Sequence, residues 1–311
     1  MTTPIADGHI TEILKGIAEG FRTQTRSPIL KTPADAALEF EDVTFPSEDG
    51  VPLEAWFIPK RGSNKLLIVN HPKGFSRYGM PSHLEPWKSA FAASGNDFEV
   101  DFIPDYRILH DAGYNVLTYD LRNFGHSGSG NGGIGSSGRY ESRDVIGSLA
   151  YVRSRPDLKD MTLGLYSKCL GCNATLHAMS RHPGHFEDVR CMVGAQPLSP
   201  GYFLEKQLSF MGIPIERMSE LDEYIRLITS FSLRQLSPVD VAKDAVLPVY
   251  LYQVRDDSMT SPEDVQTIFD NIPVSDKELF WIRGETRRWD GYTYFQLHPE
   301  QIIEWLAQRM T

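Results

Sequence analysis

The chain lacks the features that mark membrane, secreted and disulfide-rich proteins. No apolar run approaches the roughly 20 residues that a membrane-spanning helix requires, and residues 1–7 lack the basic and apolar regions of a signal peptide. The 3 cysteines, Cys169, Cys172 and Cys191, are too few and too clustered for a disulfide framework. We therefore expect a cytoplasmic protein that does not contact a membrane and whose thiols stay free.

Positive charge is also scarce. The formal net charge is -10 at pH 7, and no segment supplies a basic phosphate-binding face, so we expect no nucleic-acid partner. Apolar residues are 41% and charged residues 23% of the 311 positions, which suits one large α/β domain or two small ones. We expect a small-molecule substrate as the partner. No metal or organic cofactor is implied, and the oligomeric state is left open.

Short apolar segments alternate with amphipathic segments along most of the chain. The expected strands are 38–45, 53–58, 66–69, 115–119, 162–166, 189–193, 249–254 and 278–282. The expected helices are 10–21, 106–112, 140–152, 170–180 and 302–310. The first two strands form an antiparallel hairpin. Short buried strands separated by helices then predict the α/β class, with a mostly parallel central sheet flanked by helices.

Three segments lie outside this alternation. Residues 1–37 read as an N-terminal helical segment that covers the sheet or joins a lid, and residues 38–311 as the main domain. Within that domain, residues 79–104 are a long insertion and residues 196–238 a helical lid. Both would lie at the carboxyl edge of the sheet, where α/β proteins bind ligands. Aromatic residues in them predict an apolar pocket: Trp87, Phe91, Tyr202, Phe203, Phe210, Tyr224 and Phe231.

The most informative segment is 164–174, with the sequence GLYSKCLGCNA, which reads as a strand that turns sharply into a helix. In such a turn, a G-x-S-x-G motif presents a nucleophile. Here Ser167 replaces the first glycine and Cys169 replaces the serine. The dipole of the following helix favours a thiolate, and a thiolate can attack a carbonyl without the help of a base. Cys169 is therefore the candidate nucleophile.

Three further motifs accompany this turn. They are VNHPKGFS at 69–76, DLRNFGHSG at 120–128 and VRDDSMTSP at 254–262. In this order, the motifs resemble the α/β-hydrolase superfamily over residues 38–310, and most closely its cysteine-bearing, dienelactone-hydrolase-like and acyl-peptidase-like branches. The resemblance implies an α/β-hydrolase fold with a catalytic triad in the order nucleophile, acid, histidine.

The resemblance also implies an oxyanion hole beside the nucleophile. One donor would be the backbone N–H of Leu170, the residue after Cys169. The second would come from the loop at 69–76. Pro72 has no N–H, so Lys73 is the expected donor, with Gly74 as the next choice. We group Gly74 and His71 with the residues that could bind substrate or balance charge, although a histidine in this loop more often holds the structure together.

The triad acid has a candidate, but the triad histidine does not. Asp257 is the expected acid, with the adjacent Asp256 as the alternative. The loop 282–292, which should carry the histidine, places Arg287 at the expected position. Arginine does not titrate in proteins and cannot serve as a general base. Arg287 could instead pair with Asp257, bind a substrate carboxylate or hold the nucleophile as a thiolate. His298 is the next histidine and would reach the site only through a rearranged loop.

These observations predict acyl transfer through a thioester at Cys169 on a small carbonyl substrate such as an ester, thioester or lactone. The missing histidine predicts slow attack by water, so the reaction could be hydrolysis of activated substrates, or intramolecular transfer or cyclisation. The alternative is a non-catalytic, ligand-binding pseudo-hydrolase. A redox or metal role for the pair Cys169 and Cys172 is the third hypothesis.

Overall fold

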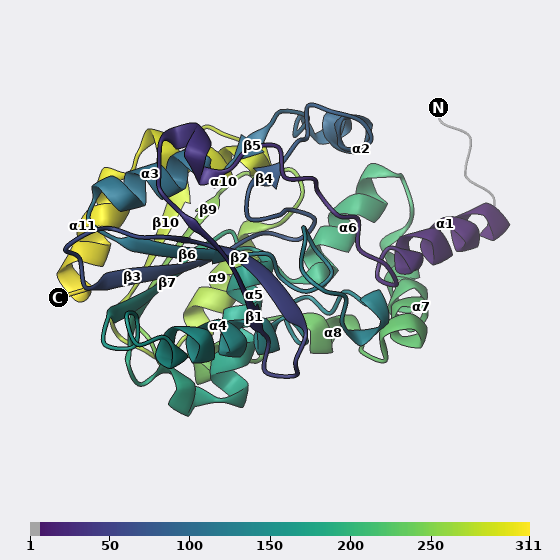
Figure 1. The fold of residues 1–311 in the computed structure, drawn as a ribbon. Helices are drawn as coiled ribbons and strands as arrows, with labels where there is room; N and C mark the ends of the chain where they lie inside the picture. Colours follow the sequence, from purple (N-terminus) through teal and green to yellow (C-terminus); the bar gives the residue numbers. More distant parts are fainter. Residues whose placement is uncertain (1–6) are drawn as a thin grey trace.

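A computed structural model describes residues 7–311 of the chain and shows an eight-stranded central sheet (Figure 1). The strand order is β1-β2-β6-β3-β7-β8-β9-β10. The strands are β1 (Glu41–Pro46), β2 (Pro52–Ile58), β3 (Lys65–Asn70), β6 (Asn115–Tyr119), β7 (Thr162–Lys168), β8 (Val189–Ala195), β9 (Val249–Val254) and β10 (Lys277–Ile282). β1 and β2 form the expected antiparallel hairpin, β2 pairs antiparallel with β6, and all later pairs are parallel. The predicted α/β sheet is thus confirmed.

Helices cover both faces of the sheet (Figure 1). One face carries α4 (Ser142–Ser154), α5 (Leu170–Arg181) and α9 (Pro262–Asn271), and the other carries α3 (Ile103–Asp111), α10 (Arg288–Leu297) and α11 (Glu300–Arg309). Along β3, Leu66 and Ile68 pack into the first core, while Leu67 and Val69 pack into the second. Side chains alternate across a strand, so a strand that is apolar at every position is buried on both faces.

A separate group of helices, named the lid helices here, includes the segment that the sequence predicted as a lid. It contains α6 (Pro200–Phe210), α7 (Met218–Thr229), α8 (Leu233–Leu236) and the N-terminal helix α1 (Asp7–Glu19), which packs on α7. Figure 1 shows this group to the right of the sheet, beyond the ends of its strands. Its own apolar core includes Leu14 of α1 and Leu221 of α7. The N-terminal helix therefore joins the lid, which is one of the two placements expected for it; residues 1–6 of the predicted 1–37 segment lie outside the described residues.

The insertion after β3 has structure of its own. It contains a short ribbon of β4 (Gly79–Met80) and β5 (Val100–Asp101) and the helix α2 (Trp87–Phe91). Three elements start three residues away from the expected position: α1 begins at residue 7, β1 at residue 41 and α3 at residue 103. Helix α10 was not expected at all. Single turns of 3₁₀ helix lie at Pro33–Ala36, Ala92–Ser94, Asn131–Gly133, Pro183–Phe186, Ile215–Arg217 and Ala242–Asp244.

Among residues 7–311, no helix is both long enough and apolar enough to span a membrane.

Candidate active site

Cys169 occupies the sharp turn between β7 and α5. Its backbone φ of 47° and ψ of -104° lie outside the regions that side chains normally allow. The N–H of Cys169 donates to the carbonyl oxygen of Ala195 at 2.7 Å, which ties the turn to the end of β8. Only 6% of Cys169 is exposed, and that part faces a cavity. The strand, turn and helix that the motif predicted are therefore present.

Two residues of the altered motif explain how the turn is packed. Ser167 is buried, and its hydroxyl forms a 3.0 Å hydrogen bond with the hydroxyl of Thr175, so a serine fits where the usual motif has glycine. Gly171 remains a glycine because a Cβ there would lie 2.2 Å from Oδ1 of Asn70. Its N–H donates to the carbonyl oxygen of His71 at 3.2 Å. Gly171 thus joins the turn directly to the loop after β3.

The backbone around Cys169 offers two sets of N–H donors. Leu170 is the first residue of α5, so its N–H has no acceptor within the helix. In the loop after β3, Phe75 donates to the carbonyl oxygen of Pro72 at 3.2 Å. No hydrogen bond within residues 7–311 is recorded for the N–H of Lys73 or of Gly74. The expected donors are therefore free of protein acceptors in the part of the chain that the structure describes.

His71 is held entirely by the protein. Its Nε2 accepts from the N–H of Leu121 at 2.9 Å, and its Nδ1 lies 2.8 Å from the carbonyl oxygen of Pro72. These contacts fit a neutral ring that carries its proton on Nδ1. Burial is the main cause that lowers the pKa of His71. Since both nitrogens are occupied, His71 is placed to anchor the loop after β3 to the turn after β6 rather than to touch a substrate.

Asp257 follows β9 and is only 4% exposed, whereas its neighbour Asp256 is exposed. The Asp257 carboxylate accepts hydrogen bonds from the N–H of Met259 at 2.9 Å and from the hydroxyl of Thr260 at 2.8 Å. Gln253 adds a third bond at 3.3 Å. Of the two aspartates that the sequence offered, Asp257 is therefore the one that faces the interior.

The arginine that meets Asp257 is Arg288, so the expected pairing of Asp257 with Arg287 is wrong. Nη1 of Arg288 lies 2.7 Å from Oδ2 of Asp257, and both side chains are buried. Arg287 instead forms an exposed pair with Asp290, at 2.7 Å, and lies over the ring of Phe98. The segment that was expected to be a loop becomes helical at Arg288, which turns Arg288 inward and leaves Arg287 outside as the residue preceding the helix.

Arg288 has few donors left for a ligand. Besides Asp257, it donates through Nε to the hydroxyl of Tyr292 at 3.0 Å and through Nη2 to the carbonyl oxygen of Gln196. Burial opposes its charge, but Tyr292, Cys169 and Asp257 outweigh burial and raise the pKa of Arg288. Arg288 is therefore a permanent cation and cannot act as a base. His298 does not replace it, because it is exposed at the opposite end of α10.

Tyr292 is a site residue that the sequence analysis missed. Its hydroxyl accepts the bond from Arg288, and Tyr292 lines the same cavity as Cys169. Burial, the largest cause, and the neighbouring Cys169 hold the pKa of Tyr292 well above its usual value, although Arg288 acts in the opposite direction. The ring is fixed by edge contacts with Phe75, at 5.3 Å between ring centres. Hydrogen bonds thus link Tyr292 through Arg288 to Asp257, and Tyr292 lines the cavity together with Cys169.

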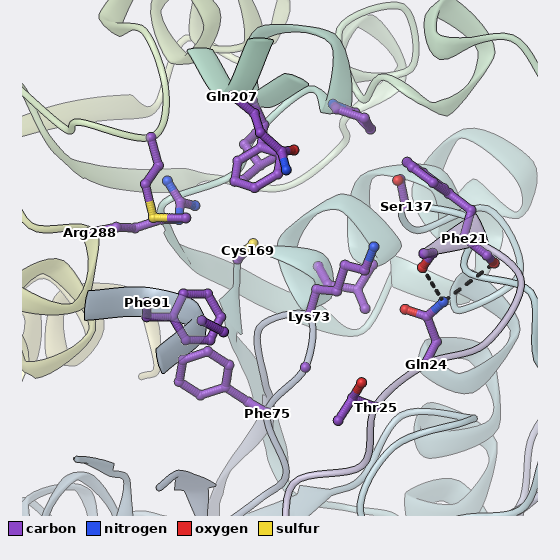
Figure 2. Close-up of a pocket in the computed structure, with 18 of the residues that line it drawn as sticks. Phe21, Gln24, Thr25, Lys73, Phe75, Phe91, Ser137, Cys169, Gln207 and Arg288 are labelled. Carbon is purple, nitrogen blue, oxygen red and sulfur yellow. Dashed lines mark hydrogen bonds between the residues drawn. The ribbon is translucent and has the colours of Figure 1, made fainter. Parts of the chain in front are cut away.

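The site opens into a cavity of about 780 Å³, which is large enough for a small organic ligand. Its walls come from α1 and the segment after it, the loop after β3, α2, α6, the turn at Cys169 and the start of α10 (Figure 2). Of the lid and insertion aromatics, Trp87, Phe91 and Phe203 line the cavity, whereas Phe210 is 76% exposed. The lining is mostly apolar, so the predicted pocket exists but uses only part of the predicted set.

The remaining cysteines lie away from the cavity. Cys172 is fully buried, its sulfur packs against Gly194 of β8, and burial raises the pKa of its thiol. Cys191 is buried in the core between the sheet and α11, and burial raises the pKa of its thiol to about 12. Within residues 7–311, no group of three or more His, Cys, Asp and Glu side chains is arranged to hold a metal ion.

Comparisons with known proteins show what the chain is similar to in sequence and in fold. No protein-family model matches the chain. The uncharacterized protein YqkD of Bacillus subtilis (strain 168) is 24% identical over 204 residues, or 65% of this chain and 60% of YqkD. The matched region therefore spans less than two thirds of that relative's length.

Solved structures resemble the chain over more of its length. Pyrococcus furiosus esterase Pf2001 aligns with a TM-score of 0.67 and 20% identity, covering 93% of this chain and 98% of the esterase. Dienelactone hydrolase from Anabaena variabilis aligns with a TM-score of 0.55 and 14% identity, covering 88% of this chain and 99% of that enzyme. Pyrococcus horikoshii acylaminoacyl peptidase aligns over 88% of this chain and 42% of that protein, with a TM-score of 0.58 and 14% identity. The chain has the α/β-hydrolase fold that its motifs implied.

Proposed function

We propose that the protein is an acyl-transfer enzyme in which Cys169 forms a thioester with a small carbonyl substrate. The observation that carries the proposal is the position of Cys169, which is held in a strained turn at the start of α5 and faces the apolar cavity. Strained backbone is maintained where function requires it, and the N-terminus of a helix favours a thiolate and a developing oxyanion. The cytoplasm is the proposed location, because its reducing conditions would keep Cys169 as a free thiol.

In the first step, the sulfur of Cys169 attacks the carbonyl carbon and forms a tetrahedral oxyanion. The N–H groups of Leu170 and of Lys73 or Gly74 would stabilise that oxyanion. When the intermediate collapses, the bond to the leaving group breaks and the leaving group must gain the proton that Cys169 gives up. Tyr292 lines the cavity together with Cys169, so we propose that its hydroxyl accepts the thiol proton while passing its own proton to the leaving group.

The second step favours a nucleophile other than free water. Hydrolysis of a thioester normally uses a histidine base, whereas the residue that bonds Asp257 here is Arg288, a permanent cation. Tyr292 is a poor base as well, because its raised pKa keeps it protonated at neutral pH. A hydroxyl or amine carried by the acyl group would attack at high effective concentration, releasing a cyclic product and regenerating the thiol. We therefore propose intramolecular transfer or cyclisation, with slow hydrolysis of activated substrates as a side reaction.

The decisive experiment is the mass of the intact protein after incubation with activated esters and acyl thioesters, including esters that carry a hydroxyl. We expect an acyl adduct on Cys169 that persists with simple acyl groups and is discharged as a lactone when the acyl group carries a hydroxyl. Cys169→Ala should abolish the adduct without changing the melting temperature. An adduct that forms equally in Cys169→Ala would refute the role of Cys169.

A second candidate is a ligand-binding protein without catalysis. It is favoured by the buried bond between Arg288 and Asp257, which neutralises the acid that would otherwise orient a histidine. On this alternative, iodoacetamide would modify Cys169 no faster than Cys191, and no ester in the panel would give an adduct or a product. Rapid modification of Cys169 alone would favour the enzyme.

A further inference from the structure

One charged group in the cavity has no partner in the described protein. Lys73 leaves the loop after β3 and extends into the cavity, toward the side where Phe21 and Ser137 lie and away from Cys169 (Figure 2). Its Nζ lies 4.7 Å from the centre of the Phe21 ring. Within residues 7–311 no hydrogen bond and no ion pair is recorded for Nζ of Lys73. Lys73 is exposed, so its ammonium keeps water around it and can meet an anionic ligand that enters the cavity.

The neighbouring charges do not supply the missing partner. The charges of Glu141 and Cys169 act on Lys73, but the Glu141 carboxylate already binds the hydroxyl of Ser136 and the N–H of Gly138, and Cys169 carries a charge only as a thiolate. Arg288, the other cation in the cavity, is already paired with Asp257. The free positive charge in the cavity therefore resides on Lys73.

We propose that Lys73 binds a carboxylate at the far end of the substrate, opposite the carbonyl that reacts with Cys169. This rests on the proposed acyl-transfer function. The substrate class is an ester or thioester whose acyl group has an apolar body and one terminal carboxylate. The apolar body would lie along Phe203 and Leu204 of the lid. A single ammonium matches a singly charged carboxylate better than a doubly charged phosphate, which usually needs several donors.

The test compares two matched series of substrates. The first series contains p-nitrophenyl monoesters of linear dicarboxylic acids from adipic to sebacic acid, and the second contains the same esters with the free carboxylate capped as a methyl ester. We expect the protein to prefer the free acids in kcat/KM, although its net charge of -10 disfavours anions generally. In Lys73→Met the ratio of free to capped kcat/KM should fall about tenfold or more, and Lys73→Arg should restore most of it.

Lys88→Met is the matched control. Lys88 lies on α2 and is exposed, one residue from the cavity-lining Trp87, but does not line the cavity itself. Its substitution should leave the ratio of free to capped kcat/KM unchanged. If Lys73→Met reduces kcat/KM for both series by the same factor, then Lys73 acts at the reacting carbonyl or supports the fold, and the carboxylate proposal is wrong.

A binding measurement separates this inference from the proposed chemistry. Isothermal titration of Cys169→Ala with monomethyl suberate, which carries one carboxylate, needs no turnover. We expect its affinity to fall about tenfold in the double variant Cys169→Ala/Lys73→Met, and dimethyl suberate to bind both variants equally. If the wild-type protein forms no adduct with any ester while this Lys73-dependent binding is seen, the acyl-transfer proposal is wrong and the carboxylate site remains. Equal affinity of monomethyl suberate for both variants would overturn the site; Lys73→Gln replaces Lys73→Met if the latter does not fold.

Discussion

Nη1 of Arg288 donates a hydrogen bond to Oδ2 of Asp257 at 2.7 Å, and both side chains are almost completely buried. In a Ser-His-Asp triad the acid orients and stabilises a titrating histidine. Here the acid meets a cation that never loses its proton. Asp257 is therefore neutralised by a fixed charge, and the proposed proton transfer at Cys169 uses Tyr292, another hydrogen-bond partner of Arg288.

The first prediction concerns stability. Arg288→Ala should lower the free energy of unfolding by about 3–5 kcal/mol, because it leaves Asp257 as a buried and unpaired charge. The double variant Arg288→Met/Asp257→Leu should recover part of this loss, since it removes both charges together. Arg287→Ala is the control, because the pair of Arg287 and Asp290 is partly exposed and contributes at most about 1 kcal/mol. Urea unfolding at pH 7 measures all three; equal losses in Arg287→Ala and Arg288→Ala would contradict the assignment.

The second prediction concerns the missing base. Arg288→His should shorten the lifetime of the acyl adduct on Cys169 about tenfold or more, because a neutral imidazole can bind Asp257 through one nitrogen and activate water with the other. Arg287→His should have no effect, since position 287 faces away from Asp257. The measurement is the decay of the adduct mass with time. An unchanged lifetime in Arg288→His would mean that an imidazole at this position does not reach the thioester.

Tyr292→Phe tests the proposed proton path. We expect the rate of adduct formation to fall about 100-fold with leaving groups that need a proton, such as alkoxides, and to change much less with p-nitrophenolate. The fold should survive, because the ring keeps its contacts with Phe75 and Trp289. Tyr294→Phe on the same helix is the control, since Tyr294 does not line the cavity. Equal losses for both leaving groups would point to a structural role for the Tyr292 hydroxyl.

The sequence alone did not show that Arg288, and not Arg287, is the arginine that pairs with Asp257. Local sequence patterns predicted the strands, the turn at Cys169 and the order of the motifs, and these together predicted the fold. Which arginine points inward depends on where α10 begins, and a long-range contact helps to set that point. The N–H of Trp289 lies in the first turn of α10 and has no acceptor within the helix, so it donates to Oδ1 of Asn96 in the insertion at 2.8 Å. No local pattern encodes a partner almost two hundred residues away.

Tyr292 could have been found from one further signal. It follows Arg288 by four residues, and side chains at that spacing meet on one face of a helix. The spacing of Trp289, Tyr292 and Phe295, all buried, also fits a helical face. The sequence analysis treated 282–292 as a loop, and in a loop these spacings have no geometric meaning. A correct helix assignment would therefore have brought Tyr292 into the site together with Arg288.

The last prediction concerns acid stability and involves His177 on α5. His177 is 3% exposed, and burial, followed by the charges of Arg139 and Arg181, lowers its pKa from 6.5 to about 3. Between those two pH values the unfolded chain binds a proton that the folded chain does not, so stability rises with pH across this window and is lost as the pH falls from about 6.5 to about 3.

His177→Leu should therefore make the free energy of unfolding less dependent on pH below 6.5, by up to about 5 kcal/mol across the window. Urea unfolding of both proteins at pH 7, 6, 5 and 4 isolates the effect, because every other titrating group is shared. The exposed His126→Leu is the matched control and should follow the wild type at each pH. Parallel curves for wild type and His177→Leu would show that His177 does not titrate differently in the folded and unfolded chains.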